Sequence, residues 1–141
     1  MPVILFFDSN VLIYLIEGDA ILSARVQQTV QTLYNTCSDV SIAVSALALL
    51  ECRVAPLRDK NTAVLKRYDE FFSTESLQIV DLSRTVLDSA TRIRAGFGLK
   101  TPDAIQAACC LSLESEHLFL TEDRAFSKVE PLHVYNVLTQ R

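Results

Sequence analysis

Glycine and proline are scarce in this sequence and tryptophan is absent: its 141 residues include three glycines and four prolines. Disordered and collagen-like chains are rich in one or both of the scarce residues, so the composition excludes those classes. Half of the residues are hydrophobic, which is enough for one sizeable core in a chain of this length. We therefore expect one compact domain over residues 1–141.

A long uninterrupted hydrophobic run is also missing. The longest apolar stretch near the N-terminus covers residues 3–16, but Asp8, Ser9 and Asn10 interrupt it and Glu17 ends it. It is too short for a membrane-spanning helix, and it lacks the basic start and continuous apolar segment of a signal peptide. We expect no membrane association and a cytoplasmic protein.

The cysteines and histidines do not have the spacing of zinc ligands. Four cysteines occur without a C-x-x-C pair, and the two histidines, His117 and His133, stand apart. In a chain so rich in core residues, we expect the cysteines to be buried free thiols rather than a disulfide framework.

Positive charge is limited, with 13 basic against 17 acidic side chains and a formal net charge of −4. Such a chain does not bind nucleic acid through its overall charge, so any contact needs a local basic rim. Solvated helix faces are the alternative explanation for the basic residues. The rim candidates are Arg53, Arg58 and Lys60, and Arg92, Arg94 and Lys100.

Short apolar segments alternate with segments of helical periodicity. We expect strands at residues 3–7, 40–44, 77–80, 118–121 and 133–137, the last at an edge. Helices are expected from 11 to 17, 20 to 37, 45 to 56, 62 to 73, 83 to 96, and from 101 onward. The expected caps are Ser9 or Asn10, Ser45, Ser83 and Thr101. This alternation predicts an α/β fold: a three-layer α/β/α sandwich around a mostly parallel sheet of four to five strands.

Four acidic residues stand where strands meet helices or where an apolar helix face is interrupted. Asp8 follows the first strand, and Asp123 lies two residues beyond the fourth. Asp103 lies in the first turn of a helix, and Glu51 shares a helix face with core residues. Because ligands bind outside the carboxyl ends of parallel strands, these side chains can converge there. Carboxylates are costly to bury without a cation, and oxygen-only ligands favour Mg²⁺ or Mn²⁺ over zinc.

Each acid also has an ordinary structural explanation. Asp8 alone could be a local cap, and Asp123 could turn the chain. Asp103 could complement the dipole of its helix, and Glu51 could reach solvent or pair with a nearby arginine. Taken one at a time, the residues leave both explanations open.

The segments around the four acids match a known family when they are taken together. They are "VILFFDSN" with Asp8, "SALALLE" ending at Glu51, "LKTPDAIQAA" around Asp103, and "LTEDRAF" with Asp123. With them the chain resembles the PIN-domain ribonucleases over essentially its whole length, and especially the VapC-type toxins of toxin–antitoxin pairs. Gln106 stands where many members have histidine, and Glu122 stands where asparagine is common.

The resemblance implies a PIN-like sandwich and a Mg²⁺-dependent endoribonuclease, with Mn²⁺ as a possible substitute. Metal binding and catalysis would fall to Asp8, Glu51, Asp103 and Asp123. Supporting contacts would come from Ser9, Asn10 and Thr121, and a weak nucleic-acid rim from Arg53, Arg92, Arg94 and Lys100. The family also implies an RNA substrate, a cognate antitoxin and a homodimer.

Three alternatives compete with this interpretation. A DNA-directed PIN-like nuclease is disfavoured because the chain has no long basic arch or added duplex-binding module. A catalytically weak PIN module that binds RNA or a protein partner is disfavoured because all four acids are present. A phospho-acceptor receiver domain would need paired acids after the first strand, where Asp8 stands alone.

Overall fold

The structure, a computed structural model, describes residues 2–138. Helices and strands alternate along the chain as the sequence predicts. In chain order they are β1 (Val3–Phe7), α1 (Ser9–Glu17), α2 (Ala20–Thr36), β2 (Val40–Ser45), α3 (Leu47–Arg58), α4 (Thr62–Phe72), β3 (Gln78–Val80), α5 (Arg84–Phe97), α6 (Thr101–Ser112), β4 (His117–Thr121), the 3-10 helix η1 (Arg124–Lys128) and β5 (Val134–Asn136).

The five strands form one parallel sheet in the order β3-β2-β1-β4-β5. β1 is the central strand, which explains its wholly apolar sequence, because a central parallel strand is covered on both faces. Phe7 of β1 pairs with Leu120 of β4, so Asp8 comes beside Thr121 where both strands end. We call this end of the sheet the carboxyl edge and the opposite end the amino edge.

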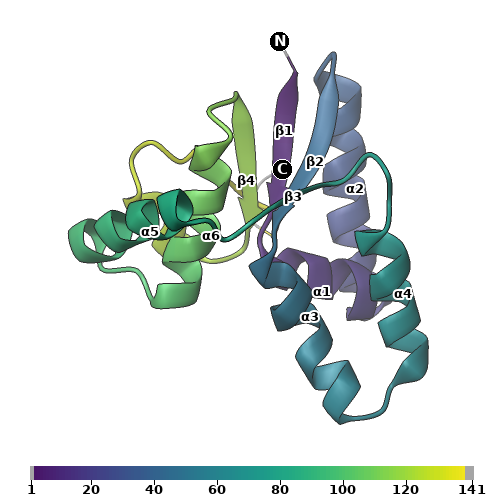
Figure 1. Cartoon of the computed structure of the whole chain (residues 1–141). Helices are drawn as coiled ribbons and strands as arrows, with labels where there is room; N and C mark the ends of the chain where they lie inside the picture. Colours follow the sequence, from purple (N-terminus) through teal and green to yellow (C-terminus); the bar gives the residue numbers. More distant parts are fainter. Residues whose placement is uncertain (1, 139–141) are drawn as a thin grey trace.

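Helices cover both faces of the sheet, so the predicted three-layer α/β/α architecture is confirmed. α5 and α6 lie on one side and α1 to α4 on the other (Figure 1). On the α5–α6 side Phe6 stacks on Phe119 with ring centroids 5.6 Å apart, while Leu5 and Phe7 face the opposite cluster. Each such side chain stabilises the fold by about 1.5–3 kcal/mol when fully buried.

The starts of three helices differ from the sequence prediction. Asp8, rather than Ser9 or Asn10, occupies the N-cap position of α1, which begins two residues early. Ala46 rather than Ser45 precedes α3, although the Ser45 hydroxyl still accepts a hydrogen bond from the Leu47 amide. Lys100 precedes α6, so Thr101 is its first residue. The predicted cap at Ser83 is confirmed.

The predicted end of α3 near Pro56 is wrong, because the helix continues to Arg58. Proline lacks an amide hydrogen and disturbs the preceding turn of a helix. Here Pro56 stands in the last turn, where few hydrogen bonds remain to be lost, and its ring is buried. The remaining boundaries agree with the sequence within one residue, and β5 lies at an edge as expected.

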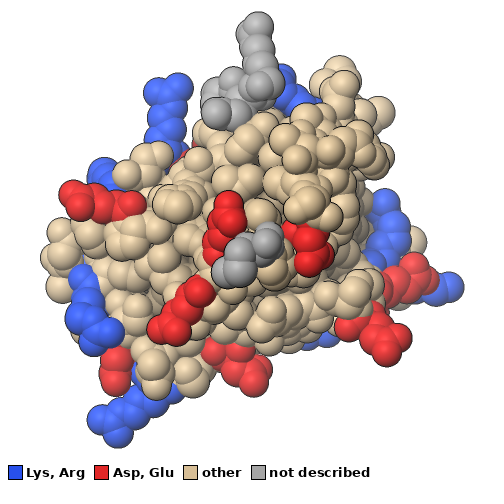
Figure 2. All heavy atoms as spheres, turned by 90° about the horizontal axis from the view of Figure 1, so that it is seen from above, with Lys and Arg blue, Asp and Glu red and all other residues tan. Residues whose placement is uncertain are grey.

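The cysteines are packing residues, as predicted: all four are free thiols, and Cys52, Cys109 and Cys110 are buried. Between residues 2 and 138, no helix combines the length and the apolar character needed to cross a bilayer. Seen from the amino edge, where β1 begins, acidic and basic side chains are both spread over the surface (Figure 2).

Candidate functional site

Asp8 is buried at the carboxyl edge, directly before α1. Its side chain is 5% exposed, and its Oδ2 accepts a hydrogen bond of 2.8 Å from the Thr121 hydroxyl. The carboxylate makes no capping hydrogen bond to α1 in the described structure. The Asp8 backbone carbonyl, not its side chain, accepts from the amides of Val11 and Leu12. The simple capping role considered from the sequence is therefore wrong for the side chain.

Glu51 extends from α3 into a small buried network. Its Oε1 accepts from the Ser9 hydroxyl at 2.9 Å and from the Gln106 amide nitrogen at 3.0 Å. The same Gln106 nitrogen also lies 2.8 Å from the Ser9 oxygen. Among the described residues, neither of the two ion pairs of the chain involves Glu51. Pairing with a neighbouring arginine, one of the explanations left open by the sequence, is therefore not its role in this structure.

Asp123 and Asp103 are close enough for the charge of Asp123 to raise the pKa of Asp103. Asp123 precedes η1, and its Oδ1 accepts from the Ala125 amide at 2.9 Å, so it does cap a turn as its sequence context allows. Its own amide donates to the Thr121 hydroxyl oxygen at 3.0 Å, which ties it to the residue that contacts Asp8. Asp103 stands half-buried in the first turn of α6.

The four acids influence one another electrostatically, and we call them the carboxylate cluster. The pKa of Asp8 is raised from 3.8 to about 7: burial has the largest effect, the Thr121 hydrogen bond opposes it, and the charges of Asp103 and Glu51 add to it. The pKa of Asp103 is also raised, first by burial and then by the charges of Asp123 and Glu51. Groups that disfavour one another's ionisation in this way attract a cation.

The carboxylate cluster is not a ready-made metal cage. Within residues 2–138, no three histidine, cysteine, aspartate or glutamate side chains converge closely enough to hold an ion. Like charges hold such side chains apart when no cation lies between them. The donor set nevertheless suits a hard divalent cation, because every candidate ligand is oxygen. Buried beside Glu51, the Gln106 Oε1 atom also has no hydrogen-bond partner among the described residues.

The predicted supporting residues differ in what they do. Ser9 and Thr121 are buried and contact Glu51 and Asp8 respectively. Asn10 is exposed in the first turn of α1, and its supporting role stays a prediction.

The four residues of the predicted basic rim differ in their contacts and exposure. Lys100, at the start of α6, is near enough for its charge to lower the pKa of Asp103. Arg53 instead forms an ion pair of 3.5 Å with Asp69 of α4, and Arg94 donates to the Leu99 carbonyl. Arg92 is exposed on α5. Of these four residues, Lys100 is the one whose charge acts on the pKa of Asp103.

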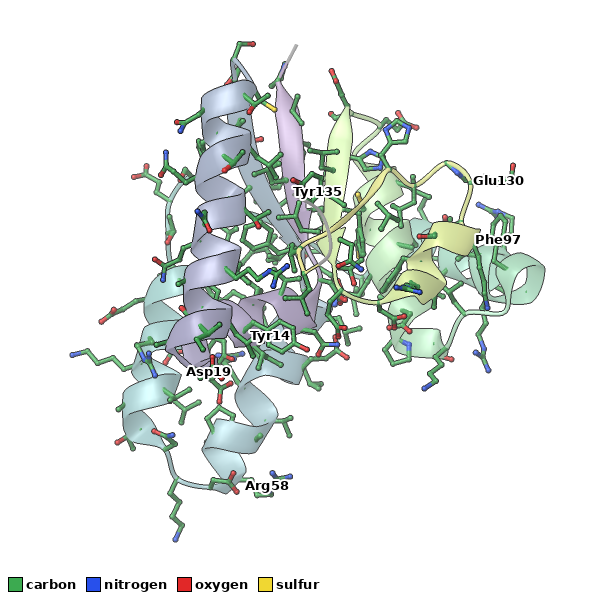
Figure 3. All side chains as sticks on the ribbon, turned by 180° about the vertical axis from the view of Figure 1, so that it is seen from behind. Tyr14, Asp19, Arg58, Phe97, Glu130 and Tyr135 are labelled. Carbon is green, nitrogen blue, oxygen red and sulfur yellow. The ribbon has the colours of Figure 1, made fainter. Side chains whose placement is uncertain are left out.

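Two contacts at this edge were not found by sequence reasoning. Tyr14 projects from α1 toward the segment after β4, where its hydroxyl donates to the Glu122 Oε1 at 3.2 Å (Figure 3). The pairing spans 108 positions of sequence, and no periodic pattern signals it. Gln106 lies three residues after Asp103, so helical spacing could have pointed to its share in the site. The sequence alone shows Gln106 only as a departure from the family.

Three solved structures share this fold. The chain aligns with VapBC2 from Rickettsia felis bound to a DNA fragment from their promoter (18% identity, TM-score 0.75, 94% of this chain and 98% of that chain). It also aligns with a toxin–antitoxin complex from Klebsiella pneumoniae (21%, 0.72, 94% and 96%). The third is VapBC-1 from nontypeable Haemophilus influenzae (15%, 0.67, 95% and 98%). At these identities the likeness establishes the fold.

Comparison with curated proteins found no match. The model of the PIN domain family matches residues 5–131, which include the whole carboxylate cluster and every strand except β5, with β1 covered from Leu5 onward. The sequence motifs, the five-stranded parallel sheet and this match agree, and the chain belongs to the PIN domain family.

Proposed function

We propose that this protein is a metal-dependent endoribonuclease that hydrolyses RNA phosphodiester bonds and acts as the toxin of a toxin–antitoxin pair. The observation that carries the proposal is the burial of Asp8 beside the charges of Glu51 and Asp103 at the carboxyl edge. Burying like charges is costly, and a divalent cation offsets that cost while attracting the phosphate of a substrate.

The carboxylate cluster, Asp8, Glu51, Asp103 and Asp123, would hold Mg²⁺, or Mn²⁺ in its place. Bound there, the ion would supply charge stabilisation at the phosphate and a more acidic water molecule. The protein side chains orient the ligands: Thr121 holds one oxygen of Asp8, and Ser9 and Gln106 hold one oxygen of Glu51. Asp103 or Asp123 would accept the proton of the attacking water.

The raised pKa of Asp8 gives the proposal a defined pH dependence. With a pKa of about 7, Asp8 binds a proton that competes with the cation at lower pH. Metal affinity and cleavage should therefore rise as the pH increases through about 7.

The partner proposal rests on the similar structures and on the family. Two of these structures are named VapBC and the third is a toxin–antitoxin complex. We extend this to a cognate antitoxin that binds the present chain, and to a homodimer of the toxin. We also propose that the protein acts in the cytoplasm.

The deciding experiment is an RNA-cleavage assay on the wild type and on Asp103→Asn, with Mg²⁺ and with EDTA. Asp103→Asn keeps the shape of a half-buried side chain and removes its charge. Cleavage should fall about 1,000-fold, because several kcal/mol of metal-borne charge stabilisation depend on the ligands. Asp88→Asn, at an exposed position on α5, is the matched control and should cleave normally.

Three results would count against the proposal. Cleavage that persists undiminished in EDTA would exclude the metal mechanism. Cleavage of single- or double-stranded DNA with RNA left intact would favour the DNA-directed alternative. Tight binding of RNA without cleavage in Mg²⁺ would favour the catalytically weak binding module. Growth arrest on expression, relieved by the product of a neighbouring small gene, separates the toxin role from nuclease activity alone.

A further inference from the structure

Gln106 is the most deeply buried polar side chain of α6 and lies at the meeting point of three segments. It is 1% exposed. Its amide nitrogen contacts Ser9 at the start of α1 and Glu51 on α3, at 2.8 and 3.0 Å. α6 therefore contributes two polar residues to this edge: Asp103, whose carboxylate faces the cluster, and Gln106, three residues further along the helix.

The orientation of the Gln106 amide follows from its neighbours. The Ser9 hydroxyl carries one hydrogen, which it donates to the Glu51 Oε1 at 2.9 Å. Its oxygen is then an acceptor, and only the nitrogen of Gln106 can donate to it. The opposite orientation would place the amide oxygen against a carboxylate oxygen and a hydroxyl already committed as a donor. Two donors therefore meet on one oxygen of Glu51, and neither of these hydrogen bonds occupies its other oxygen.

A purely structural role does not explain this arrangement. The Oε1 atom of Gln106 is buried without a hydrogen-bond partner among the described residues, and such an atom costs stability. An apolar residue of similar shape, such as methionine, would avoid that cost among the small residues Ala104, Ala107 and Ala108 of the same helix. The glutamine is thus poorly matched to packing and well matched to holding Glu51.

We infer that Gln106 is a positioning residue: it fixes the Glu51 carboxylate, together with Ser9, so that Glu51 faces a divalent cation in the cluster. This inference rests on the proposed function. Residues that hydrogen-bond to metal ligands fix the orientation of those ligands, and their loss typically weakens metal affinity by about 10–100-fold.

The test is calorimetric titration of the folded protein with Mn²⁺ alone, together with thermal unfolding in EDTA. Gln106→Met should weaken Mn²⁺ binding about 10–100-fold. It should change the melting temperature in EDTA little, because the loss of the donor to Ser9 and Glu51 offsets the removal of the unpaired oxygen. A residue with a structural role alone would instead give a clearly lower melting temperature and an unchanged affinity. Gln28→Met, at an exposed position on α2, is the matched control for the added methionine.

Two further variants guard against an unfolded or ambiguous result. Gln106→Leu also removes the donor, so it should weaken binding about as much as Gln106→Met. In a Glu51→Ala background, adding Gln106→Met should leave the Mn²⁺ dissociation constant unchanged, because the carboxylate that Gln106 holds is gone.

The outcomes separate this inference from the proposed function. Wild-type affinity in folded Gln106→Met, or a further loss in the Glu51→Ala background, would overturn the positioning role. Mn²⁺ binding by the wild type with the expected losses, but without RNA cleavage, would support the positioning role and reject the proposed nuclease. A wild type that does not bind Mn²⁺ would overturn both.

Discussion

The two ends of β4 both carry buried polar side chains, but their hydrogen bonds are arranged differently. At the amino edge the His117 Nδ1 donates to the Ser115 carbonyl at 3.0 Å, and its Nε2 accepts from the His133 amide at 3.1 Å. The backbone amide can only donate, so Nδ1 must carry the ring hydrogen. His133 also stacks on His117 with ring centroids 5.1 Å apart. Both ring nitrogens of His117 are thus occupied by the chain itself.

At the carboxyl edge the acceptors exceed the donors. Thr121 gives its single hydroxyl hydrogen to Asp8, while Asp8 also experiences the charges of Asp103 and Glu51. The positive charge of Lys100 lowers the pKa of Asp103, but this effect is smaller than the effects of burial and of the neighbouring acids that raise it. Buried polar side chains at the two ends of one strand therefore differ in how fully they are hydrogen-bonded. At the amino end of β4 each ring nitrogen of His117 has its partner, whereas at the carboxyl end carboxylate oxygens outnumber the donors that reach them.

The largest expected effect is a gain in stability on removing a charge at the carboxyl end. Asp8 has a pKa of about 7 when folded against 3.8 ordinarily, so the folded state binds its proton more tightly than the unfolded state. Ionising Asp8 therefore lowers stability progressively as the pH rises from about 3.8 to about 7. In EDTA at pH 8, Asp8→Asn should raise the free energy of unfolding by roughly 2–4 kcal/mol and abolish RNA cleavage.

Urea denaturation at pH 8 and at pH 3 measures this effect. The gain should vanish at the lower pH, where Asp8 is protonated in both states. Asp88→Asn on exposed α5 should change stability little at either pH. A loss of stability in Asp8→Asn at pH 8 would mean that the chain itself already stabilises the Asp8 carboxylate, as it satisfies His117 at the amino end.

The opposite sign is expected at the amino end. His117→Ala leaves the His133 amide without its acceptor and removes the stacked ring, so the free energy of unfolding should fall by about 1–3 kcal/mol. Mn²⁺ affinity should not change, since His117 lies at the other end of the strand. Denaturation with and without Mn²⁺ checks both points, and His133→Ala tests the stacking separately from the hydrogen bond, which uses the backbone of residue 133. A stability of His117→Ala equal to that of the wild type would show that the hydrogen bonds and the stacking of His117 do not stabilise the fold.

Much of this contrast could be predicted from the sequence. The apolar β1 sequence and the alternation of strands and helices predict a parallel sheet, and in such a sheet residues that follow strands meet at one edge. That rule alone brings Asp8 near the segment that follows β4, before any family is considered. The roles of the four acids as metal ligands remain predictions.

The sequence could not provide the contacts that link distant segments. Gln106 and Ser9 are 97 positions apart, and Tyr14 and Glu122 are 108 apart. Neither pair belongs to a periodic pattern, and each depends on how two elements pack in three dimensions. Arg53 was placed on the rim for its charge alone, whereas the packing of α3 against α4 brings it to Asp69. Local patterns predict elements and edges; side-chain partners depend on tertiary packing.

A smaller effect is expected from the hydroxyl that links Asp8 to Asp123. Thr121→Val keeps the shape of the side chain but removes the donor to Asp8 and the acceptor for the Asp123 amide. Because that hydrogen bond lowers the pKa of Asp8, its loss should raise this pKa above about 7. Mn²⁺ binding should then require a higher pH, and stability should fall by about 1 kcal/mol.

Titrations with Mn²⁺ at several pH values follow the shift. Thr91→Val, at an exposed position of α5, is the control. It removes a hydroxyl that donates to the carbonyl of Leu87 in its own helix. An unchanged pH dependence in Thr121→Val would show that the Thr121 hydrogen bond does not lower the pKa of Asp8.

The smallest expected effect concerns the rim, where Tyr14 meets Glu122. Burial raises the pKa of the Tyr14 hydroxyl first, and the charge and hydrogen bond of Glu122 raise it further. Glu122→Gln removes the charge, so the pKa of Tyr14 should fall toward 10.0 but stay above it, because the burial remains. Ultraviolet titration of the tyrosines, assigned with Tyr14→Phe, measures the shift, and Glu130→Gln at an exposed position away from this pair is the control. Glu122 also adds negative charge beside the place proposed for the phosphate, so Glu122→Gln should modestly lower the KM for RNA with kcat unchanged. A Tyr14 pKa that does not move would show that Glu122 does not act on the Tyr14 hydroxyl, and an unchanged KM would show that its charge does not reach the place proposed for the phosphate.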